Sequence, residues 1–153
     1  MPNSNTTPYL TDLQLELHVD NFSTAEQFYQ LLGFQTVYSE DQYRVISRGR
    51  TVINLYGGDE RVYSHSFFSQ YSPHSPRGLG VEIIIFVDEL DAVFDRISKS
   101  ATVQAPIRLR PWGVRDFRIV DPFGYYLRIS EPYNTVERTT PSTELPESKT
   151  ESQ

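Results

Sequence analysis

The chain has 153 residues, of which 38% are hydrophobic and 22% are charged, as expected for one domain or two small halves that share a core. It contains no cysteine, which excludes disulfides and thiolate sites for metal binding or catalysis. Its formal net charge of -6 argues against nucleic acid as a partner and is compatible with a cationic ligand. There is no apolar run of bilayer-spanning length and no signal-peptide pattern, so we expect no membrane partner and a cytoplasmic location.

Composition divides the chain into five segments. Residues 1–11 are a polar leader. Residues 132–153 are rich in Thr, Ser, Pro and Glu, and we expect this tail to be disordered because it can bury too little apolar surface to offset its ordering entropy. Two patterned segments lie between the leader and the tail, at 12–57 and 80–131, and an aromatic linker at 58–79 separates them.

The first patterned segment predicts a strand, a helix and three further strands. Apolar residues alternate with polar ones from Leu13 to Val19, which is the period of a half-buried strand. Ser23 and Glu26 have the spacing of a capping box, and an apolar stripe at helical spacing follows and ends at Gly33. The expected strands after this helix are residues 35–39, 43–47 and 51–56.

The second patterned segment repeats that order. A strand is expected from Val81 to Val87, and Asp88 is a candidate N-cap for a helix with an apolar stripe from Leu90 to Ile97. The strands expected after it are residues 102–109, 116–120 and 125–130. The sequence therefore predicts an α+β fold built from two βαβββ units.

The linker between the units is long and aromatic. It contains Tyr63, Phe67, Phe68 and Tyr71. Long irregular segments inside compact domains are usually functional or disordered, and this one is too aromatic for disorder. We consider two interpretations equally, a flap that covers a sheet edge and a lid over a pocket, and expect His65 and His74 to be exposed.

Two motifs resemble those of a known family. Residues 28–34 (FYQLLGF) are similar to an FY-x-x-LGF helix end, and residues 111–124 are similar to a PWG-x-x-x-F-x-x-x-DP-x-G signature. Together with the duplicated pattern over residues 12–131, they resemble the vicinal oxygen chelate superfamily, which includes glyoxalase I, extradiol dioxygenases and bleomycin resistance proteins. The resemblance implies two curved mixed sheets around a cavity, commonly built across a two-fold dimer, so a homodimer is expected.

The resemblance also locates four positions at which metal-dependent relatives carry ligands. In this chain they hold Gln14, Asn54, Glu82 and Arg128. A divalent cation needs several neutral or anionic donors together, and a guanidinium would repel it. The resemblance therefore favours a site without a metal cofactor.

Neighbouring residues leave an alternative open. Glu16 and His18 share the strand face of Gln14, so a divalent-metal site formed by Glu82 with Gln14, Glu16 or His18 is conceivable. The competing interpretation is that Glu16 and Glu82 form ion pairs with Arg118 and Arg128, and we favour it because buried charges require partners.

Aromatic residues are expected to provide stacking surfaces for a flat or amphipathic ligand. The candidate ligand-binding residues are Gln14, Glu16, His18, Asn54, Phe67, Phe68, Glu82, Trp112, Arg118, Tyr126 and Arg128.

The favoured hypothesis is a metal-independent small-molecule binder, similar to bleomycin resistance proteins, which sequesters an antibiotic or another amphipathic or cationic ligand. The second is a metal-dependent glyoxalase-like or dioxygenase-like enzyme. The third is a protein-interaction module with a vestigial pocket. The fold alone does not choose among them, because one fold hosts several chemistries.

Overall fold

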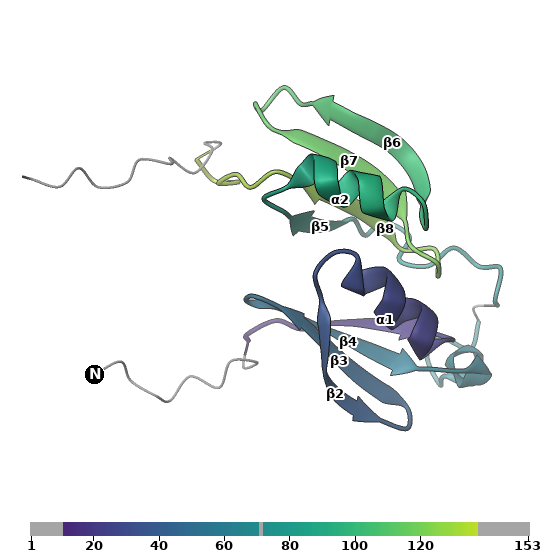
Figure 1. Ribbon diagram of the computed structural model, residues 1–153. Coiled ribbons are helices and arrows are strands. Elements are labelled where there is room, and N and C mark those ends of the chain that lie inside the picture. The colour runs from purple at the N-terminus through teal and green to yellow at the C-terminus, as the bar shows by residue number, and fades with distance from the viewer. Residues whose placement is uncertain (1–10, 71, 138–153) are drawn as a thin grey trace, which may run out of the picture.

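The computed structural model describes residues 11–70 and 72–137, so Tyr71 and most of the predicted leader and tail lie outside the described residues. Figure 1 shows two units, each a sheet with one helix against it. The first unit comprises β1 (Leu15–Val19), α1 (Phe22–Gln30), β2 (Gln35–Glu40), β3 (Tyr43–Arg48) and β4 (Thr51–Gly57). The second comprises β5 (Ile83–Phe86), α2 (Leu90–Ile97), β6 (Thr102–Leu109), β7 (Arg115–Val120) and β8 (Tyr126–Ser130).

The two sheets have the same topology. Sheet 1 has the strand order β1-β4-β3-β2 and sheet 2 the order β5-β8-β7-β6. The first pair in each sheet is parallel and the other two pairs are antiparallel. The prediction of an α+β fold with two βαβββ units is therefore confirmed.

One face of each sheet packs into a single core shared by both units. Alternate residues of β1, such as Leu17 and Val19, point into this core together with α1, and Ile85 of β5 enters it from the second unit. Tyr29 of α1 donates a hydrogen bond from its hydroxyl to Asp121 Oδ2 at 2.8 Å, and both side chains are buried. The FY and DP motifs therefore contact each other and join the two units.

The helix starts differ from those predicted. The N-cap of α1 is Asn21, whose Oδ1 accepts the Thr24 N–H at 2.9 Å, so the predicted cap at Ser23 is wrong. Glu26 does not complete a capping box, because its carboxylate accepts a hydrogen bond from the Thr36 hydroxyl of β2 at 2.7 Å. The N-cap of α2 is Glu89 rather than Asp88, and its side chain makes no cap hydrogen bond.

The strand starts also differ. Leu13 is 86% exposed and lies before β1, and Val81 is exposed and lies before β5. Each strand begins two residues later than predicted because pairing with β4 starts at Leu15 and pairing with β8 starts at Ile83.

The linker contains a short 3₁₀ helix, η1 (Glu60–Ser64), and runs along one side of both units (Figure 1). Gly57, the last residue of β4 before the linker, has φ +108°, and an added Cβ would lie 2.1 Å from Val62 Cγ1, so only glycine fits there. Beyond β8, the ring of Tyr133 packs 5.3 Å from that of Phe86, so the first residues of the predicted tail contact the domain. Among the described residues, no helix is long and apolar enough to cross a membrane.

Candidate functional site

Each sheet has an open face on the side away from the core. On the open face of sheet 1, the register places Glu16 of β1 beside Asn54 of β4, and His18 beside Tyr56. The buried Asn54 donates from Nδ2 to Gln14 Oε1 at 2.8 Å. The structure therefore brings together Gln14, Glu16, His18 and Asn54, as the alternation of β1 predicts.

Glu16 is paired, but not with an arginine. Its Oε2 accepts a hydrogen bond from the Tyr43 hydroxyl at 2.7 Å, and its Oε1 lies 3.4 Å from His18 Nε2. The predicted Glu16–arginine ion pair is therefore wrong, because the side chains that lie beside Glu16 on β1 and β3 are His18 and Tyr43. Burial lowers the pKa of His18, and the nearby Glu16 carboxylate opposes that shift in part.

The linker covers His18 with aromatic rings. The His18 ring lies 4.9 Å from Tyr56, 5.1 Å from His65 and 4.9 Å from Phe68. His65 is thus half-buried in a ring cluster, which corrects the expectation that it is exposed, whereas His74 is exposed. Phe67 is 71% exposed, so only Phe68 of the predicted pair packs against the sheet.

A groove of about 550 Å³ lies between β1 and the linker. Glu16, His18 and Phe68 line it, together with residues outside the predicted site that include Tyr63, Arg77 and Tyr125. Arg77 donates to the His18 carbonyl and lies 5.2 Å from the centre of the Tyr63 ring. The Tyr125 hydroxyl accepts the His18 N–H at 3.0 Å, so the second unit also contributes to this groove.

The open face of sheet 2 is rich in arginine. Arg118 donates from Nε to Glu82 Oε1 at 3.1 Å, which confirms this predicted ion pair, and Arg128 Nε lies 3.9 Å from the same oxygen. Asp116, fully buried, pairs with Arg110 at 2.6 Å and with Arg118 at 3.4 Å. Neither Arg110 nor Asp116 was among the predicted site residues.

Trp112 and Tyr126 lie close to these arginines. Trp112 is half-buried, and Arg128 lies 5.8 Å from the centre of its ring. Tyr126 of β8 pairs with Val120 of β7 on the strand face that carries Arg118 and Arg128. The structure therefore places the predicted residues in two groups, one on each sheet.

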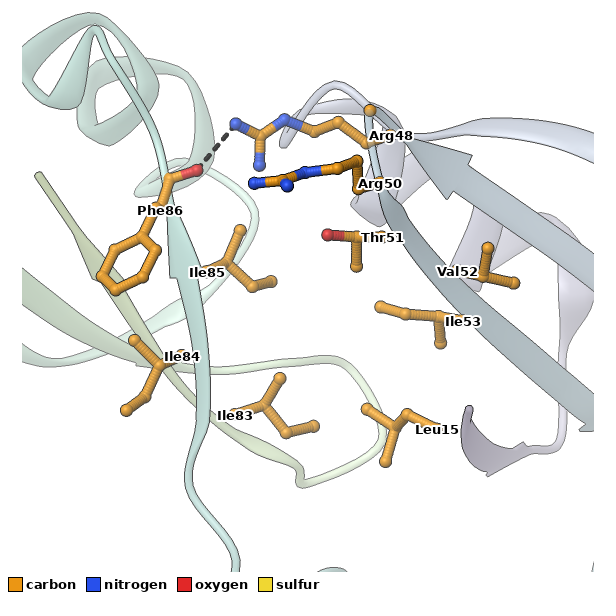
Figure 2. Close-up of a pocket in the computed structure, with 11 residues that line it drawn as sticks. Leu15, Arg48, Arg50, Thr51, Val52, Ile53, Ile83, Ile84, Ile85 and Phe86 are labelled. Carbon is orange, nitrogen blue, oxygen red and sulfur yellow. Dashed lines mark hydrogen bonds between the residues drawn. The ribbon is translucent and has the colours of Figure 1, made fainter. Parts of the chain in front are cut away.

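A second, smaller crevice of about 340 Å³ lies at the seam between the sheets. Figure 2 shows Ile83 and Ile85 of β5 facing Leu15 and Ile53, while Ile84 points away. Arg48 closes one end of the crevice by donating to the Phe86 carbonyl at 2.7 Å. No local sequence pattern predicts this seam, because it depends on how the two units pack.

The fold agrees with the comparison to known protein families. The model of the Glyoxalase/Bleomycin resistance protein/Dioxygenase superfamily matches residues 13–129. The chain belongs to this superfamily. Comparison with curated proteins finds no match.

Solved structures of the superfamily fold resemble this chain over most of its length. A protein of unknown function from Agrobacterium tumefaciens has a TM-score of 0.65 at 18% identity and covers 81% of this chain and 95% of its own. A bleomycin-binding protein complexed with bleomycin has a TM-score of 0.57 at 18% identity, with 81% and 100% covered. Lactoylglutathione lyase from Agrobacterium tumefaciens has a TM-score of 0.56 at 22% identity, with 79% and 92% covered. These similarities show the fold.

The residues at the superfamily's metal-ligand positions do not fit a divalent cation in this chain. Gln14 and Asn54 are hydrogen-bonded to each other, and Glu82 lies between two guanidinium groups that would repel a cation. Within residues 11–70 and 72–137, no three His, Asp or Glu side chains form a group that could hold a metal ion. Glu82 therefore pairs with arginine on sheet 2, while Glu16 and His18 lie on sheet 1.

Proposed function

We propose that this chain is a metal-independent protein that binds a small amphipathic molecule and sequesters it without transforming it. The observation that carries the proposal is the pairing of Glu82 with Arg118, 3.1 Å away, at a position where metal-dependent members of the superfamily need a free carboxylate. A ligand can still be held there by stacking and hydrogen bonding, because Trp112 and Tyr126 lie beside the arginines.

The proposed ligand has a cationic or polar end that lies on sheet 1. Glu16 is 42% exposed and borders the groove of about 550 Å³, so its carboxylate is available to a positive group. The net charge of -6 favours the approach of such a ligand. Bleomycin is a suitable first probe, because a structurally similar protein was solved in complex with it.

We further propose that the protein is a cytoplasmic homodimer in which sheet 1 of one chain faces sheet 2 of its partner. The two sheets of one chain share a core through their helix-bearing faces, so neither open face closes the other within the chain. A partner would cover both faces and enclose the ligand between an acidic and a basic wall. Antibiotic resistance in cells that express the protein would follow from sequestration.

Metal analysis combined with ligand titration tests this proposal. Native mass spectrometry of the full chain should show a dimer without stoichiometric metal, and titration with bleomycin should give the same affinity before and after chelator treatment. Glu16→Gln should weaken binding about tenfold, as expected for the loss of one charged contact, whereas Asp95→Asn on the exposed side of α2 should not change it. Stoichiometric metal whose removal abolishes binding would contradict the proposal.

A metal-dependent enzyme is the second candidate, and the proximity of Glu16 to His18 favours it. A carboxylate 3.4 Å from an imidazole is a common pair in metal and acid–base sites. This candidate also requires Glu82. If Glu82→Ala leaves the metal content of the purified protein unchanged, the metal-dependent candidate is excluded.

A further inference from the structure

The open face of sheet 2 concentrates positive charge where little water reaches it. We define the arginine face as Arg110, Arg118 and Arg128 with the carboxylates of Glu82 and Asp116. The arginine side chains are only 17%, 18% and 12% exposed, and Asp116 is fully buried. Three guanidinium groups against two carboxylates leave one positive charge in excess, although the chain as a whole is acidic. A desolvated charge is costly unless it is paired.

Some N–H donors of the arginine face have no hydrogen-bond partner. Asp116 Oδ1 accepts from both Arg110 and Arg118, and Glu82 Oε1 accepts from Arg118. Arg128 Nε is buried without a hydrogen-bond partner, 3.9 Å from the carboxylate that Arg118 already occupies. Arg110 Nη2 and Asp116 Oδ2 are also buried without a hydrogen-bond partner, but they belong to the Arg110–Asp116 ion pair, so each lies beside an opposite charge. Arg128 is therefore the arginine of this face for which the structure shows no hydrogen bond to a carboxylate, and a guanidinium binds planar oxyanions through two parallel N–H groups.

An aromatic surface lies beside the unmatched guanidinium. The Arg128 guanidinium lies 5.8 Å from the centre of the Trp112 ring, and Trp112 Nε1 is a second buried donor without a partner. An acceptor that enters between these two side chains, with a small shift of either, would satisfy both donors. The indole would then contact the apolar body that carries this acceptor.

We propose that the arginine face binds the carboxylate of a flat, apolar ligand, with Arg128 as the main contact. This proposal rests on the proposed binding function and adds the charge of the ligand at sheet 2. Sheet 1 has the opposite character, because Glu16 is its exposed charged group beside the groove. A ligand that spans both faces of the proposed dimer would therefore be zwitterionic, with its anionic end on Arg128.

Trp112 is the only tryptophan of the chain, so its fluorescence reports directly on this face. The full-length protein would be titrated with 1-naphthoate, with its neutral methyl ester, and with inorganic phosphate, by calorimetry and by Trp112 emission. The acid should bind at least tenfold more tightly than the ester and should change the Trp112 emission, and phosphate should bind more weakly than the acid because it has no apolar body.

Arg128→Met tests the main contact, because Glu82 retains Arg118 as a partner and the fold should persist. This variant should lower the affinity for the acid about tenfold to a hundredfold and leave the affinity for the ester unchanged, as expected for loss of a charge-assisted hydrogen bond. Arg128→Lys keeps the charge and loses the planar fork. Its affinity for the acid should lie between that of the unaltered protein and that of Arg128→Met. Arg50→Met is the matched control, because Arg50 is exposed on the β3–β4 hairpin.

The outcomes separate this inference from the proposed function. If the ester binds as tightly as the acid, or if Arg128→Met binds the acid like the unaltered protein, the anion site is wrong and the binding function stands. If phosphate binds more tightly than naphthoate, the face is a simple phosphate site and the aromatic part of the inference is wrong. If bleomycin, the acid and the ester all fail to bind, both proposals are wrong.

Discussion

The two open faces belong to copies of the same unit, yet they differ in charge and in how completely their polar groups are paired. On sheet 1, Glu16 is held by a tyrosine hydroxyl and a histidine, and linker rings cover His18. On the open face of sheet 2, arginines outnumber carboxylates, and Arg128 Nε is buried without a hydrogen-bond partner. The strand order is identical in both sheets. The two copies of the unit thus share one topology, while their open faces differ in charge and in polar pairing.

The largest effect should come from removing the buried carboxylate of sheet 2. Asp116→Ala leaves two arginines that are less than a fifth exposed without their shared partner, which should reduce the free energy of unfolding by about 3–5 kcal/mol. Urea unfolding followed by circular dichroism measures this loss. A loss below about 1 kcal/mol would show that solvent, rather than Asp116, balances the arginines, and that the two faces are less different than the structure indicates.

Breaking the link between the units should have the next largest effect. Tyr29→Phe removes the hydroxyl that donates to Asp121 and leaves a buried carboxylate oxygen unpaired, which should cost about 1–3 kcal/mol. Burial raises the pKa of Asp121, so part of this cost should disappear at acidic pH, where the carboxyl is protonated. The matched control is Tyr38→Phe. Because Tyr38 is 48% exposed, this substitution should lower the free energy of unfolding by no more than about 0.5 kcal/mol. Equal losses of unfolding free energy in Tyr29→Phe and Tyr38→Phe would show that the hydrogen bond from Tyr29 to Asp121 does not stabilise the fold.

Acidic pH should loosen the linker from sheet 1 and leave sheet 2 unchanged. Burial lowers the pKa of His18 below its ordinary value of 6.5, so the neutral ring is favoured in the folded chain. The resulting stability is complete above pH 6.5 and is lost as the pH falls through the lowered pKa. Glu16, His65 and Arg77 are the charged or titratable groups that act on this ring. Hydrogen exchange across residues 58–70 should quicken at acidic pH, and His18→Gln should remove that dependence.

The smallest effect on stability should come from Glu16→Gln. Glu16 is 42% exposed, and the amide still accepts from Tyr43, so the loss should stay below about 1 kcal/mol. The pKa of His18 should fall further, because the carboxylate that raises it is gone. A histidine titration followed by NMR checks this, with Asp95→Asn as the control. An unchanged His18 pKa would mean that the two side chains do not interact in solution.

The sequence predicted the order of the strands and helices and the facing of β1, because strict alternation and helical periodicity are local signals. It also predicted the pair of Glu82 with Arg118, which follows from the requirement that shielded charges be paired. The predicted start of α1 was wrong because Asn21 and Ser23 are both good cap residues. The path of the chain after β1 decides which of them caps the helix, and that path is not visible in the sequence.

Two parts of the site lay beyond the reach of the sequence. The pairing of β6 with β7 shifts register between Val103 and Ala105 and again before Arg108, so counting alternate positions fails across β6. The register at the end of this sheet, where Arg110 meets Asp116, was therefore not readable. Tyr125 and Arg77 join the groove through contacts that span 107 and 59 positions of the chain, and no local pattern encodes such contacts.

The hydrogen bond from Tyr29 to Asp121 also bears on how the duplicated chain can change over time. A half-length fragment ending after β4 would carry the Tyr29 hydroxyl in its core-forming surface without its acceptor, and the other half would carry the complementary carboxylate. Each half would therefore be less stable alone, with a polar group of its core unpaired, and more stable when the two halves associate. The two halves are therefore specific partners, whereas two copies of the same half would each lack one member of this hydrogen bond.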